Sequence, residues 1–275
     1  MKGLLTLISG SSGVGKNTVI AKLIEENSDL KMLRSCTSRG IRVDDKVQAD
    51  GKYAYDFVTK DVFEEKLNNG EILEYDEFSG NYYGISKDSV NEVLKQGKIG
   101  IKDITVKGVV SCKEKLPKSV DIVSVFMTLE KSKLKQRLKL RQTKDIKNRM
   151  KHYAFEQKSI SLYDFCVLNE DLDSTLSKMR AILEYGKGRE IRVGENLSKY
   201  SLDKVEKLVK KLKRNDKVKP IEVMEQDGYI YIVKGYHTYL ASIKSGMSVT
   251  KKFVDNKKII ESDQEYFKDL VNSMR

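Results

Sequence analysis

A glycine-rich segment near the N-terminus has the clearest chemical signature in the sequence. Gly10 and Gly15 precede Lys16 in the pattern G-x-x-x-x-G-K, between an apolar run and a helical stretch. Glycines let successive backbone N–H groups and a helix N-terminus point at one anion, and the lysine neutralises the outer phosphates. The segment predicts a nucleoside triphosphate site; the alternative is a glycine-rich turn with an incidental lysine. The predicted ATP-binding residues of the loop are Gly10, Ser11, Ser12, Gly13, Val14, Gly15, Lys16, Asn17 and Thr18.

The residue after the lysine departs from the usual pattern. Loops of this kind place a serine or threonine hydroxyl there, where it coordinates Mg²⁺. This sequence has Asn17 at that position, and Thr18 supplies the nearest hydroxyl. We expect ATP as phosphoryl donor and Mg²⁺ as cofactor, with the metal held through Asn17 or Thr18.

Short apolar strands and helices alternate up to about residue 184. This alternation is typical of a parallel sheet covered by helices, so we predict an α/β fold of the P-loop NTPase type. An aromatic and acidic stretch over residues 53–78 is expected to be an inserted subdomain. The predicted strands span residues 4–9, 32–36, 98–104, 122–129 and 165–168, and the predicted helices begin near Gly15, Ser86, Thr105, Lys131, Asp145 and Asp171.

A glycine-containing break after Gly186 marks the expected boundary between a domain at 1–186 and a second domain at 187–275. The second domain is expected to be a small α+β unit. Its Asp227-Gly228 pair lies between two apolar runs and predicts a β-hairpin. The elements expected there are strands 191–193, 221–224 and 229–233, a basic amphipathic helix 202–212, a helix 236–244 and a helix from Ser262.

The formal net charge of +12 favours polyanionic ligands, and the excess of basic residues is largest after Gly186. Dispersed lysines also make an ordinary solvated surface, so this alternative stays open. Three isolated cysteines, Cys36, Cys112 and Cys166, lack metal-ligand spacing and are expected to be buried thiols in a reducing, cytoplasmic compartment. No apolar run is long enough to span a membrane, and the N-terminal run is too short for a signal peptide.

Several motifs, in order and spacing, resemble the guanylate kinase family over residues 1–185. The resemblance implies transfer of a phosphoryl group from ATP to a nucleoside monophosphate, with inserted acceptor-binding and lid segments around the P-loop sheet. The motifs are Ser35-Cys36-Thr37-Ser38-Arg39-Gly40-Ile41-Arg42, residues 53–58, Ile72-Leu73-Glu74-Tyr75, Phe78-Ser79-Gly80-Asn81-Tyr82-Tyr83-Gly84, Asp103, Lys107-Gly108, Arg137, Arg141, Arg149, and Leu168-Asn169-Glu170-Asp171-Leu172-Asp173.

The resemblance also implies a role for each matching residue. Arg39, Arg42, Tyr55 and Tyr83 would hold the acceptor phosphate, and guanidinium forks with hydroxyls suit that task. The remaining implied acceptor-binding residues, which face the base, are Ser35, Glu74 and the positions now occupied by Ile85 and Thr105.

Phosphoryl transfer depends mainly on positioned cations, because charge gathers on the oxygens of the transferred group. Arg137 and Arg141 lie four residues apart on one helical face, and the resemblance places them in a lid. The alternative is a solvated basic helix, since lysines alternate with these arginines. The candidate catalytic residues are Lys16, Asp103, Arg137, Arg141 and Arg149, and Asn169 would lie near the donor adenine.

Two positions that read guanine in the family are changed. Ile85 replaces a serine or threonine, and Thr105 replaces an aspartate. Loss of a carboxylate from a closed pocket leaves base N–H groups unpaired, which removes about 1–3 kcal/mol of discrimination. Guanine is the default by resemblance, and Glu74 has the chemistry to pair with an amino or ring N–H group of another base.

Residues from about 190 to 256 resemble the ParB/sulfiredoxin-like domain family. The resemblance lies in the strand, helix and hairpin pattern and in the glycine turn that precedes a helix. It implies a phosphate site at Gly235, Tyr236, His237 and Thr238, where free helix N–H groups favour an anion. For His237 the alternative is a helix-capping or packing role. The sequence lacks the cysteine of sulfiredoxin chemistry, and it has Thr238 where many members have arginine.

Three functional hypotheses follow. The first is a nucleoside monophosphate kinase with an accessory domain that binds a second nucleotide or regulates the enzyme. The second is a nucleotide-gated DNA-binding protein, and the third is a scaffold that uses the kinase fold to bind a protein. The acceptor chemistry also admits another phosphorylated or small-molecule substrate. We expect no membrane partner, and a homodimer remains open.

Overall fold

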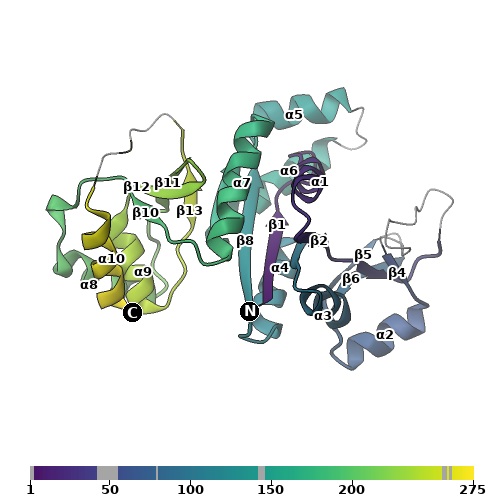
Figure 1. Cartoon of the computed structure of the whole chain (residues 1–275). Coiled ribbons are helices and arrows are strands. Elements are labelled where there is room, and N and C mark those ends of the chain that lie inside the picture. The colour runs from purple at the N-terminus through teal and green to yellow at the C-terminus, as the bar shows by residue number, and fades with distance from the viewer. Residues whose placement is uncertain (1–2, 42–54, 79, 142–145, 256–258, 260–261) are drawn as a thin grey trace. The chain divides into compact units, whose positions relative to one another are not determined.

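A computed structural model describes residues 3–41, 55–78, 80–141, 146–255, 259 and 262–275 (Figure 1). The chain divides into two compact units. The first comprises Met1–Ser9 and Ile20–Ile122, and the second comprises Gly10–Val19 and Val123–Arg275. The glycine-rich loop therefore belongs to the same compact unit as the C-terminal residues.

Three parallel strands form the main sheet of the first unit. Their order is β1 (Gly3–Ser9), β7 (Ile99–Asp103) and β2 (Leu30–Met32). All residues of β1 after Gly3 are buried, which is the pattern of a strand that is covered on both faces. Helices α3 (Lys87–Lys95) and α4 (Val106–Lys115) begin at the side-chain caps Ser86 and Thr105.

A region with a second, four-stranded sheet lies within the first unit. The strand order is β4 (Tyr55–Phe57), β3 (Ser35–Thr37), β6 (Asn81–Ser86) and β5 (Ile72–Phe78), with helix α2 (Lys60–Asn68) beside it (Figure 1). The predicted insert contributes β4, α2 and β5 to this region, which also includes β3 and β6 from outside the predicted bounds. Cys36, Phe63 and Ile72 form the small core of the region. The start of the predicted insert, residues 53 and 54, lies outside the described residues.

The prediction of one strand over residues 32–36 was wrong. The structure has two strands there, because β2 pairs with β7 whereas β3 pairs with β4 and β6 in the other sheet. The chain changes sheets at Leu33 and Arg34, and an apolar run alone cannot signal such a change. The other four strands predicted before residue 184 are confirmed to within two residues.

A six-stranded sheet runs through the second unit in the order β10-β12-β11-β13-β9-β8. Strands β8, β9, β13 and β11 are parallel neighbours, and β11 and β12 form the predicted antiparallel hairpin. The hairpin turns at Asp227 and Gly228, whose φ angles of 52° and 74° match a type I′ turn. The strands are β8 (Val120–Thr128), β9 (Phe165–Leu168), β10 (Arg192–Val193), β11 (Ile221–Gln226), β12 (Tyr229–Lys234) and β13 (Lys251–Phe253).

Strand β13 is absent from the sequence prediction, and it joins the C-terminal strands to the P-loop strands. Lys251 and Lys252 pair in register with Phe165 and Cys166 of β9. Phe253 stacks on Phe165 at 6.1 Å, and Lys251 is buried with its ammonium 5.1 Å from the same ring. The sheet therefore continues across the boundary that the sequence predicts at Gly186.

The helices of the chain follow the predicted starts closely. Helix α1 (Lys16–Glu26) begins in the second unit and ends in the first. The other helices of the second unit are α5 (Lys131–Leu140), α6 (Ile146–Glu156), the 3-10 helix η1 (Gln157–Leu162), α7 (Leu172–Gly186), the 3-10 helix η2 (Leu197–Lys199), α8 (Leu202–Lys213), α9 (Tyr236–Ser245) and α10 (Gln264–Met274). Among the residues described, no helix has the length and apolar character needed to cross a membrane.

Candidate active site

The glycine-rich loop occupies residues 10–15, between a buried strand and the first turn of α1. Gly10 and Gly15 have φ angles of 139° and 102°, which other residues rarely adopt. A Cβ atom at Gly15 would lie 2.6 Å from the Asn169 amide, and one at Gly10 would overlap the Met127 carbonyl. The loop thus needs glycine both for its turn and for its close approach to neighbouring chain segments.

Lys16 lies over its own loop. Its Nζ donates to the carbonyl of Gly10 at 2.5 Å and to that of Ser11 at 3.5 Å. These carbonyls hold the ammonium at the mouth of the loop, where triphosphate oxygens are expected to bind. The predicted metal candidates, Asn17 and Thr18, follow in the first turn of α1, and both are exposed.

Asn169 is hydrogen-bonded to the loop through its side-chain amide. Its Nδ2 donates to the Val14 carbonyl at 2.6 Å, and its Oδ1 accepts from the Thr175 hydroxyl at 2.9 Å. Asn169 follows β9, and Thr175 lies in the first turn of α7. The sequence pointed to Asn169 but not to Thr175, whose hydroxyl orients the amide.

Two of the three predicted catalytic arginines contact the loop. Arg137 of α5 donates to the Val14 carbonyl and to the Glu170 carbonyl, each at 3.3 Å. Arg149 of α6 donates to the Ser12 hydroxyl. Arg141 lies exposed at the C-terminal end of α5. The lid residues 142–145 lie outside the described part of the chain.

Glu156 is a loop contact that sequence reasoning missed. The Ser11 hydroxyl donates to its carboxylate, and Ser11 itself is only 1% exposed. The two residues are 145 positions apart. No motif in the sequence connects them, so only the fold reveals this pair.

The first unit brings together most of the residues that were predicted to bind the phosphate of the acceptor nucleotide. The guanidinium carbon of Arg39 lies 5.0 Å from the ring of Tyr55 and 5.1 Å from that of Phe57. Tyr55 and Tyr83 meet edge to face at 6.3 Å. The aromatic rings therefore hold Arg39 in place, as expected for a preorganised anion site. Arg42 lies outside the described residues.

The neighbouring Arg34 fixes the strands that carry these residues. Its Nε donates to Asp56 of β4 at 2.9 Å, and its guanidinium also pairs with Glu92 of α3. Ser35, which follows Arg34, pairs in register with Tyr55 across β3 and β4. Arg34 thus links the acceptor sheet to α3 and sets the place of Tyr55.

Glu74 lies at the expected base-reading position, close to the start of α4. Its cross-strand partner is Ile85, and its Oε2 would be 2.9 Å from a Cβ atom at Gly108, so a side chain there would push the carboxylate aside. Thr105 caps α4, because its hydroxyl oxygen accepts from the Gly108 N–H at 3.2 Å. The two positions that differ from the family, Ile85 and Thr105, are therefore close neighbours of Glu74.

The part of this site around Glu74 holds three half-buried ionisable side chains, Glu74, Lys102 and Asp103. Burial raises the pKa of Glu74 to about 7, and Asp76 adds to the increase while Lys102 opposes it. Burial lowers the pKa of Lys102, against the attraction of Asp103 and Glu74. Asp103 ends β7, half-buried, at the position expected for a functional carboxylate. Sequence reasoning missed Lys102, since a lysine in a strand is normally exposed.

The predicted C-terminal phosphate site contains a carboxylate of the protein. Gly235 turns the chain with a φ of 103°, and the Tyr236 N–H at the start of α9 donates to Glu195 Oε1 at 2.7 Å. His237 accepts from the Ser201 N–H at 3.1 Å, and its ring stacks on Tyr236 at 4.1 Å. Burial lowers the pKa of His237, which favours the neutral imidazole.

Comparison with known proteins supports the reading of the first two thirds of the chain. The family model for guanylate kinase matches residues 2–185. Guanylate kinase from Lactococcus lactis is 38% identical over 187 residues, which cover 66% of this chain and 88% of that protein. Guanylate kinase from Clostridium perfringens is 35% identical over 199 residues, covering 71% of this chain and 89% of that protein.

A solved structure agrees with this result. The crystal structure of guanylate kinase from Anaplasma phagocytophilum is similar, with a TM-score of 0.51 and 26% sequence identity, and the match covers 68% of this chain and 87% of that chain. The α/β fold with a mostly parallel sheet fits the same conclusion. The chain therefore belongs to the guanylate kinase family of nucleoside monophosphate kinases.

Proposed function

We propose that this protein transfers the terminal phosphoryl group of ATP to GMP or dGMP. The observation that carries the proposal is the donor loop, in which Lys16, Arg137 and Arg149 converge on residues 10–15. The relatives that cover the loop and the acceptor residues bear the name guanylate kinase. The acceptor phosphate would bind Arg39, Arg42, Tyr55 and Tyr83.

Glu74 would read the base, by accepting hydrogen bonds from guanine N–H groups. Its ionised form suits guanine, because a carboxylate accepts from two adjacent donors. The Thr105 hydroxyl oxygen already accepts the helix-cap bond, which leaves it one neutral lone pair in place of the carboxylate that the family has at this position. We therefore expect weaker preference for guanine than two carboxylates would provide, and measurable use of another nucleoside monophosphate.

Mg²⁺ would bind at the first turn of α1. The exposed oxygens of Asn17 and Thr18 are hard ligands of the kind that Mg²⁺ prefers, and this metal often takes only one or two protein ligands besides substrate phosphates. The bound metal supplies charge neutralisation between the donor phosphates. By resemblance to the family, Asp103 would help to organise the acceptor.

Residues 187–275 would form an accessory domain of the ParB/sulfiredoxin-like type in the cytoplasm. The order β10, α8, β11, β12, α9 supports this proposal, as does the left-handed Gly235 that starts α9. The domain would bind a second nucleotide or nucleic acid at residues 235–238. A phosphate would have to displace the Glu195 carboxylate from the helix N–H groups there.

The test incubates the pure protein with ATP, Mg²⁺ and one acceptor at a time. The panel holds ribo- and deoxynucleoside monophosphates together with free serine, and ADP release is followed. We expect the fastest release with GMP or dGMP. If none of the nucleoside monophosphates supports ADP release, the proposal is wrong. ADP release with serine as the only effective acceptor would favour a small-molecule kinase.

The second hypothesis, nucleotide-gated DNA binding, is tested on the same protein. It predicts that duplex DNA binds with an affinity that changes when ATP is added, and fluorescence anisotropy measures this. The exposed lysines of α8 are the observation that keeps this candidate in view. Homodimer formation is checked on the same samples by light scattering.

A further inference from the structure

Helix α6 presents Arg149 to the donor loop although nothing anchors the helix by apolar burial. None of its residues is buried, and Phe155 is 68% exposed. A helix without a buried face is normally held by polar contacts, since little apolar surface is removed from water. The position of the Arg149 guanidinium beside Ser12 therefore depends on the polar side chains of this helix.

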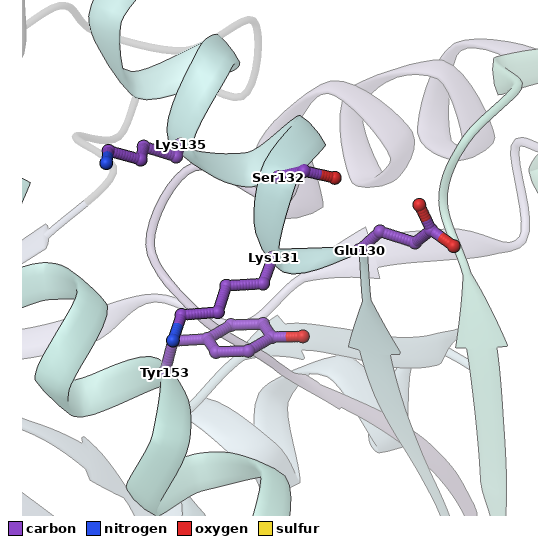
Figure 2. A pocket seen from close by; sticks show the side chains of 5 residues that line it. All are labelled: Glu130, Lys131, Ser132, Lys135 and Tyr153. Atoms are coloured by element: carbon purple, nitrogen blue, oxygen red, sulfur yellow. The ribbon is translucent and has the colours of Figure 1, made fainter.

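Polar contacts gather at the C-terminal end of α6. The Tyr153 hydroxyl donates to the Leu129 carbonyl at 3.0 Å, and the Gln157 amide donates to the Thr128 hydroxyl at 2.9 Å. Both acceptors lie at the end of β8. Tyr153 and Lys131, the latter at the start of α5, line a hollow of about 700 Å³, and Figure 2 shows its lining side chains. These two bonds hold α6 to the sheet but not to the loop.

Glu156 supplies the contact with the loop itself. Its carboxylate accepts from the hydroxyl of Ser11, next to the Ser12 that Arg149 contacts. Arg149 and Glu156 are seven residues apart, which is two helical turns, so they lie on the same side of α6. Because Ser11 is buried, its hydroxyl points into the protein and not toward the expected phosphates.

We propose that Glu156 is a positioning residue for phosphoryl transfer, which holds α6 against the donor loop through Ser11 and thereby sets the place of Arg149. The proposal rests on the donor-site role of Arg149 given above. A displacement of Arg149 by about 1 Å is enough to lower turnover by roughly 10²-fold. Glu156 need not touch a substrate to produce this effect.

The test compares Glu156→Ala, Glu156→Gln, Arg149→Ala and the Glu156→Ala/Arg149→Ala double variant in the full chain. We expect Glu156→Ala to lower kcat by about 10²-fold with little change in the KM of the acceptor. Glu156→Gln keeps an oxygen that accepts from Ser11, so it should retain most of the turnover. In the Arg149→Ala background the same Glu156→Ala change should lower kcat by less than about threefold.

His152→Ala is the matched control, because His152 is exposed on the same helix. Equal thermal unfolding midpoints for the two Glu156 variants would separate positioning from loss of stability. The proposal is wrong if Glu156→Ala keeps kcat within twofold, if Glu156→Gln is as impaired as Glu156→Ala, or if the two losses are additive. Full turnover of Arg149→Ala alone would instead contradict the donor-site assignment.

Discussion

The proposed donor and acceptor regions differ in the groups that form them. In the donor region, the loop offers backbone carbonyls and hydroxyls, and the Asn169 amide and the cationic side chains of Lys16, Arg137 and Arg149 donate to them. In the acceptor region, Arg39 is buried beside aromatic rings, and Glu74 and Lys102 are half-buried. A backbone cradle suits a feature that every nucleoside triphosphate shares, whereas buried charges allow one acceptor to be distinguished from another.

Loss of the donor cation should have the largest effect. Lys16→Ala is expected to lower kcat/KM by about 10³-fold, because the ammonium neutralises charge that develops in the transition state. Steady-state ADP release measures this, and circular dichroism checks the fold. Lys22→Ala, on the exposed side of the same helix, should keep parental activity. If Lys16→Ala keeps full turnover, the loop around Lys16 is not the donor site.

Strand β13 should stabilise the donor region and not the acceptor region. Phe253 is 4% exposed and stacks on Phe165 of β9, so Phe253→Ala should reduce the free energy of unfolding by about 3 kcal/mol. Hydrogen exchange should then show lost protection in β8 and β9 and unchanged protection in β5 and β6. Lys252→Ala, exposed on the same strand, is the control. An equal loss of hydrogen-exchange protection in both pairs of strands would mean that β13 stabilises the two regions alike.

Removal of the buried guanidinium should affect acceptor binding alone. Arg39→Ala is expected to raise the acceptor KM by roughly 10-fold to 100-fold, since hydrogen bonds to charged groups contribute about 1.5–3 kcal/mol each. The Kd of ATP, measured by calorimetry, should hardly change. Lys118→Ala, an exposed cation in the same unit, should change neither quantity. An unchanged KM for Arg39→Ala would mean that the acceptor phosphate binds elsewhere.

The smallest effect should come from the titration of Glu74. Its pKa is raised from 4.5 to about 7, so the folded state holds the proton more tightly than the unfolded state. The associated stability is present in full below about pH 4.5 and is lost as the pH rises to about 7. Urea unfolding at pH 5 and pH 7.5 should show this decrease, and Glu74→Gln should make it smaller. If the unfolding free energy of Glu74→Gln depends on pH as that of the parent does, a group other than Glu74 titrates in this range.

Much of the fold could be predicted from local patterns. The apolar runs of β1, β7, β8 and β9 and the caps of α3 and α4 are short-range signals, and the structure agrees with them. The split of residues 32–36 between two sheets could not be predicted, because each half is a few residues long and finds its partner far along the chain. Strand β13 escaped prediction for a similar reason, since two of its residues are lysines.

The sequence by itself identified the loop around Lys16 and the candidate catalytic arginines. Residue type and order suffice there, because a phosphate-binding loop needs glycines and cations at set spacings along the chain. The burial of Glu74 and Lys102, the bond between Ser11 and Glu156, and the pairing of β13 with β9 were decided by tertiary structure alone. Each of these joins chain segments that are distant in sequence, or depends on solvent exclusion by such segments. Neither property is encoded in any local pattern of residues.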